Sequence, residues 1–116
     1  EDILFSGYLS RQDLISLLAK SRALIYPSLY EGFGLPVLEA LSLHVDVACS
    51  KTSSLPEVGG EAVVYFDPGK TEDIAKSLVR FSENKDKVNS DMVSRQLAKF
   101  GWRKNAQKLI NIWAKE

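Results

Sequence analysis

The sequence predicts an α/β domain built on a mainly parallel sheet. Short continuous apolar runs recur along the chain, and such runs are typical of parallel strands that are covered on both faces. Segments with apolar residues at helical spacing lie between these runs. The alternation is itself informative, because strands that alternate with helices favour a parallel sheet with helices packed against it.

The first expected elements are a strand at 3–5 and a helix that ends near Lys20. Ser10 has the residue type and position of a helix N-cap, and Asp13 follows three residues later in a loose capping box. Leucines at helical spacing continue the pattern to Lys20. A second strand is expected at 23–26.

In the middle of the chain, predicted strands and helices continue to alternate up to a long amphipathic helix. Glycines, prolines and polar residues separate these elements. Thr71 is expected to cap the last of them. In chain order, the pattern predicts a helix at 36–43, a strand at 45–49, a helical turn at 55–58, a strand at 62–66, a turn at 67–69 and a helix that begins at Thr71.

The C-terminal third is predicted to be a helical tail. A polar connection is expected at 84–90, followed by helices at 92–100 and 102–114. The whole chain, 1–116, is interpreted as one partial domain with its sheet within about 1–83 and its tail within about 84–116. Core packing is favoured over membrane binding for an apolar stripe in the tail. That stripe consists of Trp102, Ala106, Leu109, Ile110 and Trp113.

Composition excludes several kinds of function. The 15 basic and 15 acidic residues balance, which argues against a nucleic-acid surface. A single cysteine, Cys49, excludes an intrachain disulfide, and a single histidine, His44, excludes a metal site built from several imidazoles. Cys49 lies in an apolar run and is interpreted as an inert buried thiol. No apolar run reaches the roughly 20 residues of a membrane span, and a cytoplasmic location is expected.

The segment 27–40 carries the clearest functional signal. It begins where a strand ends and finishes inside a helix, which is where open parallel sheets bind ligands. Gly32 and Gly34 permit positive φ and a close approach to the backbone. Pro36 suits the first turn of a helix. The backbone N–H groups of Phe33, Gly34 and Leu35 are therefore expected to form a site for phosphate or sugar oxygens.

Two carboxylates, Glu31 and Glu39, lie on either side of this turn with seven residues between them. Acceptor-only groups beside an anion site fit a ligand that carries hydroxyls as well as phosphates, and a nucleotide-sugar is such a ligand. The alternative is that both are solvated carboxylates favoured by the helix dipole. The surrounding glycines and proline favour the ligand site.

The run from Tyr26 to Ala40 resembles the signature of the family-4 group of retaining glycosyltransferases, with its two glutamates around Gly-Phe-Gly-Leu-Pro. The resemblance continues at 53–60 and at Asp67-Pro68. It also includes Gly7 to Ser10 and Trp102, so that it spans nearly the whole chain. Members of this group have the GT-B fold, with two Rossmann-like domains that face a cleft. The resemblance implies that this chain is the C-terminal part of the second, donor-binding domain, with a Rossmann-like parallel sheet.

The resemblance also implies roles for individual residues. Glu31 contacts the donor hexose and is the catalytic residue. Glu39 binds the ribose hydroxyls, and the loop 7–9 meets the nucleobase. The backbone from Gly32 to Leu35 holds the sugar and the diphosphate. The implied donor-binding residues are therefore Gly32, Phe33, Gly34, Leu35, Glu39, Gly7, Tyr8 and Leu9.

The implied reaction transfers a hexose from a nucleotide-sugar, such as GDP-mannose or a UDP-hexose, with retention of configuration and without a metal ion. The implied acceptor is a saccharide or a lipid-linked saccharide, which leaves a peripheral membrane location open for the full-length protein. Its acceptor domain, and the basic segment that meets the diphosphate, are expected upstream of Glu1. The isolated chain is therefore expected to be inactive.

One departure from the family pattern stands after the signature helix, where 44–46 reads His-Val-Asp in place of Gly-x-Pro. The alternative functions are a non-catalytic nucleotide-binding or structural module and a phosphorolytic enzyme of the same architecture. The intact Glu31 and Glu39 favour the transferase over the module. No lysine stands in a recognisable context for the pyridoxal cofactor that phosphorolysis in this fold uses.

Overall fold

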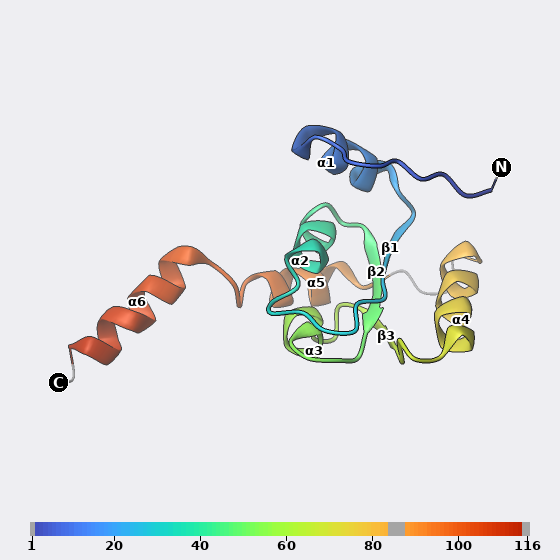
Figure 1. Ribbon diagram of the computed structural model, residues 1–116. Helices are drawn as coiled ribbons and strands as arrows, with labels where there is room; N and C mark the ends of the chain where they lie inside the picture. Colours follow the sequence, from blue (N-terminus) through green and yellow to red (C-terminus); the bar gives the residue numbers. More distant parts are fainter. Residues whose placement is uncertain (1, 84–87, 115–116) are drawn as a thin grey trace.

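The computed structural model describes residues 2–83 and 88–114 and contains a three-stranded parallel sheet with helices on both faces (Figure 1). The strands are β1 (Ala23–Tyr26), β2 (Asp46–Ser50) and β3 (Val64–Phe66), and β2 lies in the centre. Tyr26 is paired with Cys49, and Ser50 with Phe66. All three strands therefore end at the same edge, and the predicted α/β fold with a parallel sheet is confirmed.

Six helices occur among the described residues, and most of the predicted ones are confirmed within a few residues. The helix α1 begins after Ser10, whose side chain accepts a hydrogen bond from the Asp13 N–H as predicted. Lys70, and not Thr71, is the N-cap of α4, and its side chain caps nothing. The helices are α1 (Arg11–Lys20), α2 (Leu35–Ser42), α3 (Leu55–Gly59), α4 (Thr71–Ser82), α5 (Ser90–Leu97) and α6 (Trp102–Trp113).

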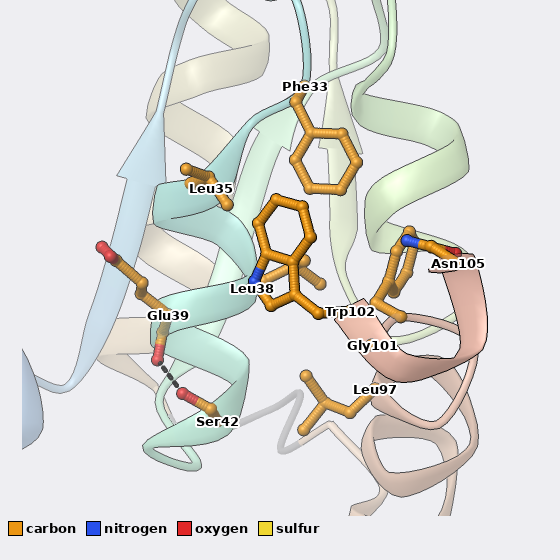
Figure 2. A pocket seen from close by; sticks show the side chains of 10 residues that line it. Phe33, Leu35, Leu38, Glu39, Ser42, Leu97, Gly101, Trp102 and Asn105 are labelled. Carbon is orange, nitrogen blue, oxygen red and sulfur yellow. Dashed lines mark hydrogen bonds between the residues drawn. The ribbon is translucent and has the colours of Figure 1, made fainter. Parts of the chain in front are cut away.

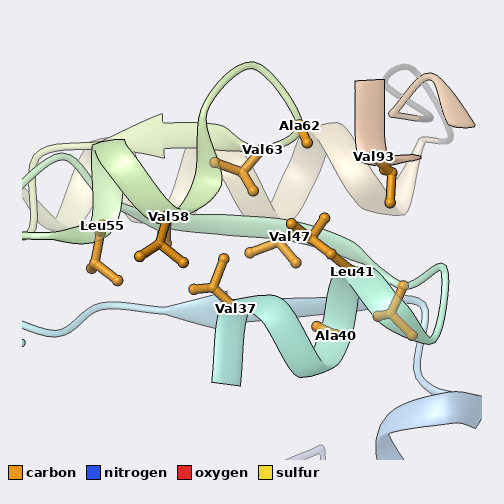
Figure 3. Packing of buried hydrophobic residues seen from close by; sticks show 11 residues of the cluster. Val37, Ala40, Leu41, Val47, Leu55, Val58, Ala62, Val63 and Val93 are labelled. Atoms are coloured by element: carbon orange, nitrogen blue, oxygen red, sulfur yellow. The ribbon is translucent and has the colours of Figure 1, made fainter. Parts of the chain in front are cut away.

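The main core lies between the sheet and the layer formed by α2, α3 and α5 (Figure 3). Side chains alternate along β2, so that Val47 and Cys49 face this layer while Ala48 faces α4. Burial raises the pKa of the Cys49 thiol to about 12. Cys49 is therefore the inert buried thiol that the sequence predicts.

The predicted strand at 3–5 is wrong. Residues 3–5 form no strand, and Phe5 is 92% exposed. A three-residue apolar run is too short to specify a partner, and β1 pairs with β2 alone. Without a neighbouring strand, the backbone N–H and C=O groups of this segment gain nothing from an extended, paired conformation.

The predicted core packing of the C-terminal stripe is also wrong within the described residues. The helix α6 projects away from the body of the domain (Figure 1), and none of its side chains is buried. Trp102 is 93% exposed and Trp113 is 74% exposed. An amphipathic pattern shows that a helix has an apolar face, but it does not identify the surface that covers that face.

The C-terminus of α2 explains why His44 can replace a glycine. The Val45 N–H donates to the Ala40 carbonyl over 3.0 Å, and the His44 N–H donates to the Leu41 carbonyl over 3.0 Å. These are the two hydrogen bonds of a Schellman motif, which requires a left-handed residue directly after the C-cap. His44 occupies that position with φ of 57°, and its exposed side chain forms no hydrogen bond or ion pair with any residue of 2–83 or 88–114.

We therefore expect His44→Gly to be neutral or to stabilise the fold by up to about 1 kcal/mol, because glycine adopts positive φ without a steric penalty. Urea denaturation measures the free energy of unfolding. Ser42→Gly is the control, since Ser42 is the last residue of α2 and has no positive φ, and the change also removes its hydrogen bond to the Glu39 carbonyl, so it is expected to destabilise. A clear loss of stability in His44→Gly would show that the imidazole makes a stabilising contact.

Candidate functional site

The loop 27–34 joins the end of β1 to the start of α2 and lies at the carboxyl edge of the sheet. Gly34 is the N-cap of α2 and is left-handed, with φ of 97° and ψ of 44°. A Cβ atom at Gly34 would lie 2.6 Å from Cδ2 of Leu55, the first residue of α3. The requirement for glycine here is therefore both conformational and steric. Gly32, by contrast, does not have the positive φ that it permits.

The loop presents a row of backbone donors. Within residues 2–83 and 88–114, the N–H groups of Gly32, Phe33, Gly34 and Leu35 donate to no protein acceptor. The following residue, Pro36, has no N–H at all. Because these donors stand at the positive end of α2, the arrangement favours phosphate or sugar oxygens. That these groups hold a ligand stays a prediction.

Hydroxyl side chains of the loop 51–54, which follows β2, hold the loop 27–34 in place. The Glu31 N–H donates to the Ser53 hydroxyl oxygen over 2.9 Å, and that hydroxyl donates to the Glu31 carbonyl over 3.0 Å. The Ser54 hydroxyl lies 2.9 Å from the carbonyl oxygens of both Glu31 and Phe33. These bonds engage the carbonyl groups of Glu31 and Phe33 and make no use of the N–H groups from Gly32 to Leu35.

Ser53 makes this contact from an unusual backbone conformation. It is a non-glycine residue with φ of 47°, a conformation that costs an ordinary residue of order 1–3 kcal/mol. Its two hydrogen bonds with the Glu31 backbone offset that cost. A strained backbone that supports a candidate ligand loop is consistent with a functional role.

The Glu31 carboxylate is held by two hydroxyl groups. The Tyr26 hydroxyl donates to Oε1 of Glu31 over 2.6 Å, and the Ser28 hydroxyl donates to the same oxygen over 2.7 Å. The hydrogen bond from Tyr26, with that from Ser28, lowers the pKa of Glu31 below its usual range. Burial, together with the contact to Glu31, raises the pKa of Tyr26 to about 12. At neutral pH the pair is therefore an ionised carboxylate and a protonated phenol.

Glu39 lies on α2, about one turn after the loop, and is half-buried. Its Oε1 forms an ion pair of 3.5 Å with the Arg11 guanidinium, whose side chain is 80% exposed. Exposed pairs of this kind contribute little stability, about 0–1 kcal/mol. A ligand with hydroxyl donors can therefore compete with Arg11 for this carboxylate.

The loop 7–9 is the most exposed part of the predicted site. Gly7 is left-handed with φ of 63°, and Tyr8 is 99% exposed. The Arg11–Glu39 ion pair brings the start of α1 to α2. No hydrogen bond within the described residues joins the loop 7–9 to α2, so its nucleobase role stays a prediction.

A groove of about 610 Å³ lies beside the loop, between α2 and the junction of α5 with α6 (Figure 2). Phe33 reaches across its end and makes an edge-to-face contact with Phe100, with ring centroids 5.7 Å apart. Its walls are largely apolar, which suits a hydrophobic surface better than a diphosphate. It is lined by Phe33, Leu35, Leu38, Glu39, Ser42, Leu97, Phe100, Gly101, Trp102 and Asn105.

The side chains that hold the loop in position were not predicted from the sequence. Tyr26 and residues 53–54 were included in the family resemblance, but no role was assigned to their hydroxyl groups. The available signal was the density of hydroxyl residues at the ends of two adjacent strands, because parallel strands bring such ends together. The overlooked residues are Tyr26, Ser28, Ser53 and Ser54.

Comparison with known proteins gives consistent results. Residues 1–98 match the family model described as glycosyl transferases group 1. The chain is 40% identical over 114 residues to the O-antigen chain mannosyltransferase B of Escherichia coli, covering 96% of this chain and 30% of that protein. It is 33% identical over 112 residues to the serotype-specific mannosyltransferase WbdA of Escherichia coli, covering 94% of this chain and 14% of that protein.

A more distant similarity extends to a mycobacterial relative. The chain is 28% identical over 116 residues to the MMP alpha-(1->4)-mannosyltransferase of Mycolicibacterium hassiacum, covering 95% of this chain and 28% of that protein. The chain thus spans less than a third of the length of each of these relatives. No helix in the described part of the chain is long and apolar enough to cross a membrane.

The two glycines of the loop provide a matched test of its geometry. We expect Gly34→Ala to destabilise the fold by about 1–3 kcal/mol, because the added methyl group meets Leu55 and the positive φ becomes strained. Gly32→Ala is expected to change the free energy of unfolding by less than about 0.5 kcal/mol, since nothing lies within 4 Å of the added atom. Equal effects in urea denaturation would contradict the geometry described for the loop.

Proposed function

Since the chain belongs to the group 1 glycosyl transferases, we propose that it is the donor-binding part of an enzyme that transfers a hexose from a nucleotide-sugar with retention of configuration. The observation that carries this proposal is the row of unpaired N–H groups from Gly32 to Leu35, with a carboxylate on each side. Along the chain, the N–H donors from Gly32 to Leu35 stand between the acceptor carboxylates of Glu31 and Glu39. In a nucleotide-sugar, the diphosphate likewise stands between the hydroxyl groups of the hexose and those of the ribose.

The backbone row receives the diphosphate and the adjoining sugar oxygens. When the bond between the anomeric carbon and the diphosphate breaks, negative charge develops on the leaving group. Oriented N–H groups and the positive end of α2 stabilise that charge without reorganising, because the contacts with Ser53 and Ser54 already fix the loop. This site requires no metal ion, because backbone dipoles meet the anion.

The two carboxylates recognise hydroxyl groups at the two ends of the diphosphate. Glu31 contacts the hexose near its reacting face and is the catalytic residue of the proposal. Glu39 accepts hydrogen bonds from the ribose, displacing the exposed Arg11. The loop 7–9 lies beyond Glu39 and meets the nucleobase.

The names of the similar proteins support mannose as the transferred sugar, since three of them are mannosyltransferases. GDP-mannose is therefore the first donor to test, with UDP-hexoses as the alternative. The acceptor is a saccharide or a lipid-linked saccharide, held by a part of the full-length protein outside this chain. The chain alone is expected to bind the nucleotide and to catalyse no transfer, because transfer requires a positioned acceptor.

Affinity for the nucleotide tests the site directly. Calorimetry on the 116-residue chain is expected to give a dissociation constant for GDP of about 0.1–1 mM, or near −4 to −5.5 kcal/mol. Glu39→Ala is expected to weaken binding by roughly 1.5–3 kcal/mol, because it removes charge-assisted hydrogen bonds to the ribose. Adding EDTA is expected to leave the affinity unchanged.

Two variants serve as controls. Glu72→Ala removes a carboxylate from the first turn of α4, on the other face of the sheet, and Arg11→Ala removes only the partner of Glu39. Both are expected to bind GDP at least as well as the parent chain. Equal losses in Glu39→Ala and Glu72→Ala would contradict the assignment of Glu39. Binding of GDP without transfer by the full-length protein would favour a non-catalytic nucleotide-binding module.

A further inference from the structure

The Glu31 carboxylate is arranged asymmetrically. Both hydroxyl donors, from Tyr26 and Ser28, meet Oε1. No described residue, within 2–83 and 88–114, donates a hydrogen bond to Oε2 or forms an ion pair with Glu31. One oxygen is therefore engaged by the protein and the other is available to a ligand.

The Tyr26 hydroxyl is held rigidly. Tyr26 is the last residue of β1, where it is paired with the buried Cys49, and its ring is partly buried against the main core. Its pKa is raised to about 12, so the phenol is protonated at neutral pH, and it donates to Glu31 because an ionised carboxylate only accepts. Ser28 supplies the second donor from the loop itself.

These two donors also maintain the negative charge of Glu31. Because no cation among the described residues pairs with this carboxylate, hydroxyl groups alone lower its pKa. An ionised Oε2 accepts hydrogen bonds and repels a phosphate oxygen. The ligand group that suits it is an uncharged hydroxyl.

We propose that Tyr26 and Ser28 are positioning residues that hold Glu31 as a one-oxygen acceptor for a hydroxyl of the donor sugar. This inference rests on the proposed function, and it adds the residues that set the orientation of Glu31. Tyr26 and Ser28 act through the carboxylate and do not touch the sugar. Their removal therefore affects recognition of the sugar and leaves recognition of the nucleotide intact.

A double-mutant cycle in the full-length protein tests this inference. Tyr26→Phe is expected to weaken GDP-mannose binding about 3- to 10-fold, the loss typical of one hydrogen bond. Affinity for GDP alone is expected to stay within about twofold, because GDP lacks the hexose. In the Glu31→Ala background, Tyr26→Phe is expected to cost less than about twofold, because the group through which it acts is absent.

Tyr65→Phe is the matched control. The Tyr65 hydroxyl donates to the carbonyls of Gly60 and Pro56, away from Glu31, so its effect on binding is expected to be the same in both backgrounds. Ser28→Ala is a second probe that is expected to follow Tyr26→Phe. A spectroscopic readout accompanies both, since the ¹³C titration midpoint of the Glu31 carboxyl is expected to move to higher pH in each variant.

Two failures are distinguishable. If the full-length protein binds GDP-mannose but Tyr26→Phe costs equally in both backgrounds, or weakens GDP as much as GDP-mannose, the positioning role is wrong. An unmoved Glu31 titration in both variants would likewise overturn it. If neither GDP-mannose nor any UDP-hexose binds the wild-type protein, the proposed function itself fails, and the positioning role for a donor sugar fails with it.

Discussion

The candidate site depends on the contact between two loops at the carboxyl edge of the sheet. Ser53 and Ser54, after β2, bond the backbone of Glu31 and Phe33, after β1. Leu55 then occupies the space in which a side chain at Gly34 would lie. These contacts use the backbone carbonyls of Glu31 and Phe33 and leave the N–H groups from Gly32 to Leu35 without a partner among the described residues. Without these contacts, a glycine-containing loop of this length has many accessible conformations and would lose entropy on binding a ligand.

The same contact explains why the site can be specific while carrying few charged groups. In the proposed function, anion recognition rests on backbone dipoles at the start of α2, and hydroxyl recognition rests on the carboxylates of Glu31 and Glu39. Each carboxylate is held differently. Two hydroxyl donors fix Glu31, whereas an exposed and replaceable arginine meets Glu39. The first arrangement suits a reacting centre that requires a fixed geometry, and the second suits a peripheral group of the ligand.

Much of the fold could be predicted because its signals are local. The cap of α1 by Ser10 and the apolar run of β1 depend on neighbours in sequence. The strand at 3–5 and the burial of the apolar face of α6 were mispredicted. Apolar residues in a sequence indicate a need for burial, but they do not identify the surface that buries them. The loop of the site was predicted from its glycines and Pro36. Its support by Tyr26, Ser53 and Ser54 was missed, because hydrogen bonds between separate loops leave no periodic pattern in the sequence.

The proposed function depends on the backbone from Gly32 to Leu35 being an anion site for a nucleotide. Amide chemical shifts during a titration with GDP-mannose measure this most directly, because each N–H of the loop reports its own hydrogen bonding. We expect the amides of Gly32, Phe33, Gly34 and Leu35 to shift first and together, while that of Glu31, already bonded to Ser53, shifts less. Shifts confined to other parts of the folded chain, with these four amides unmoved at several millimolar ligand, would contradict it.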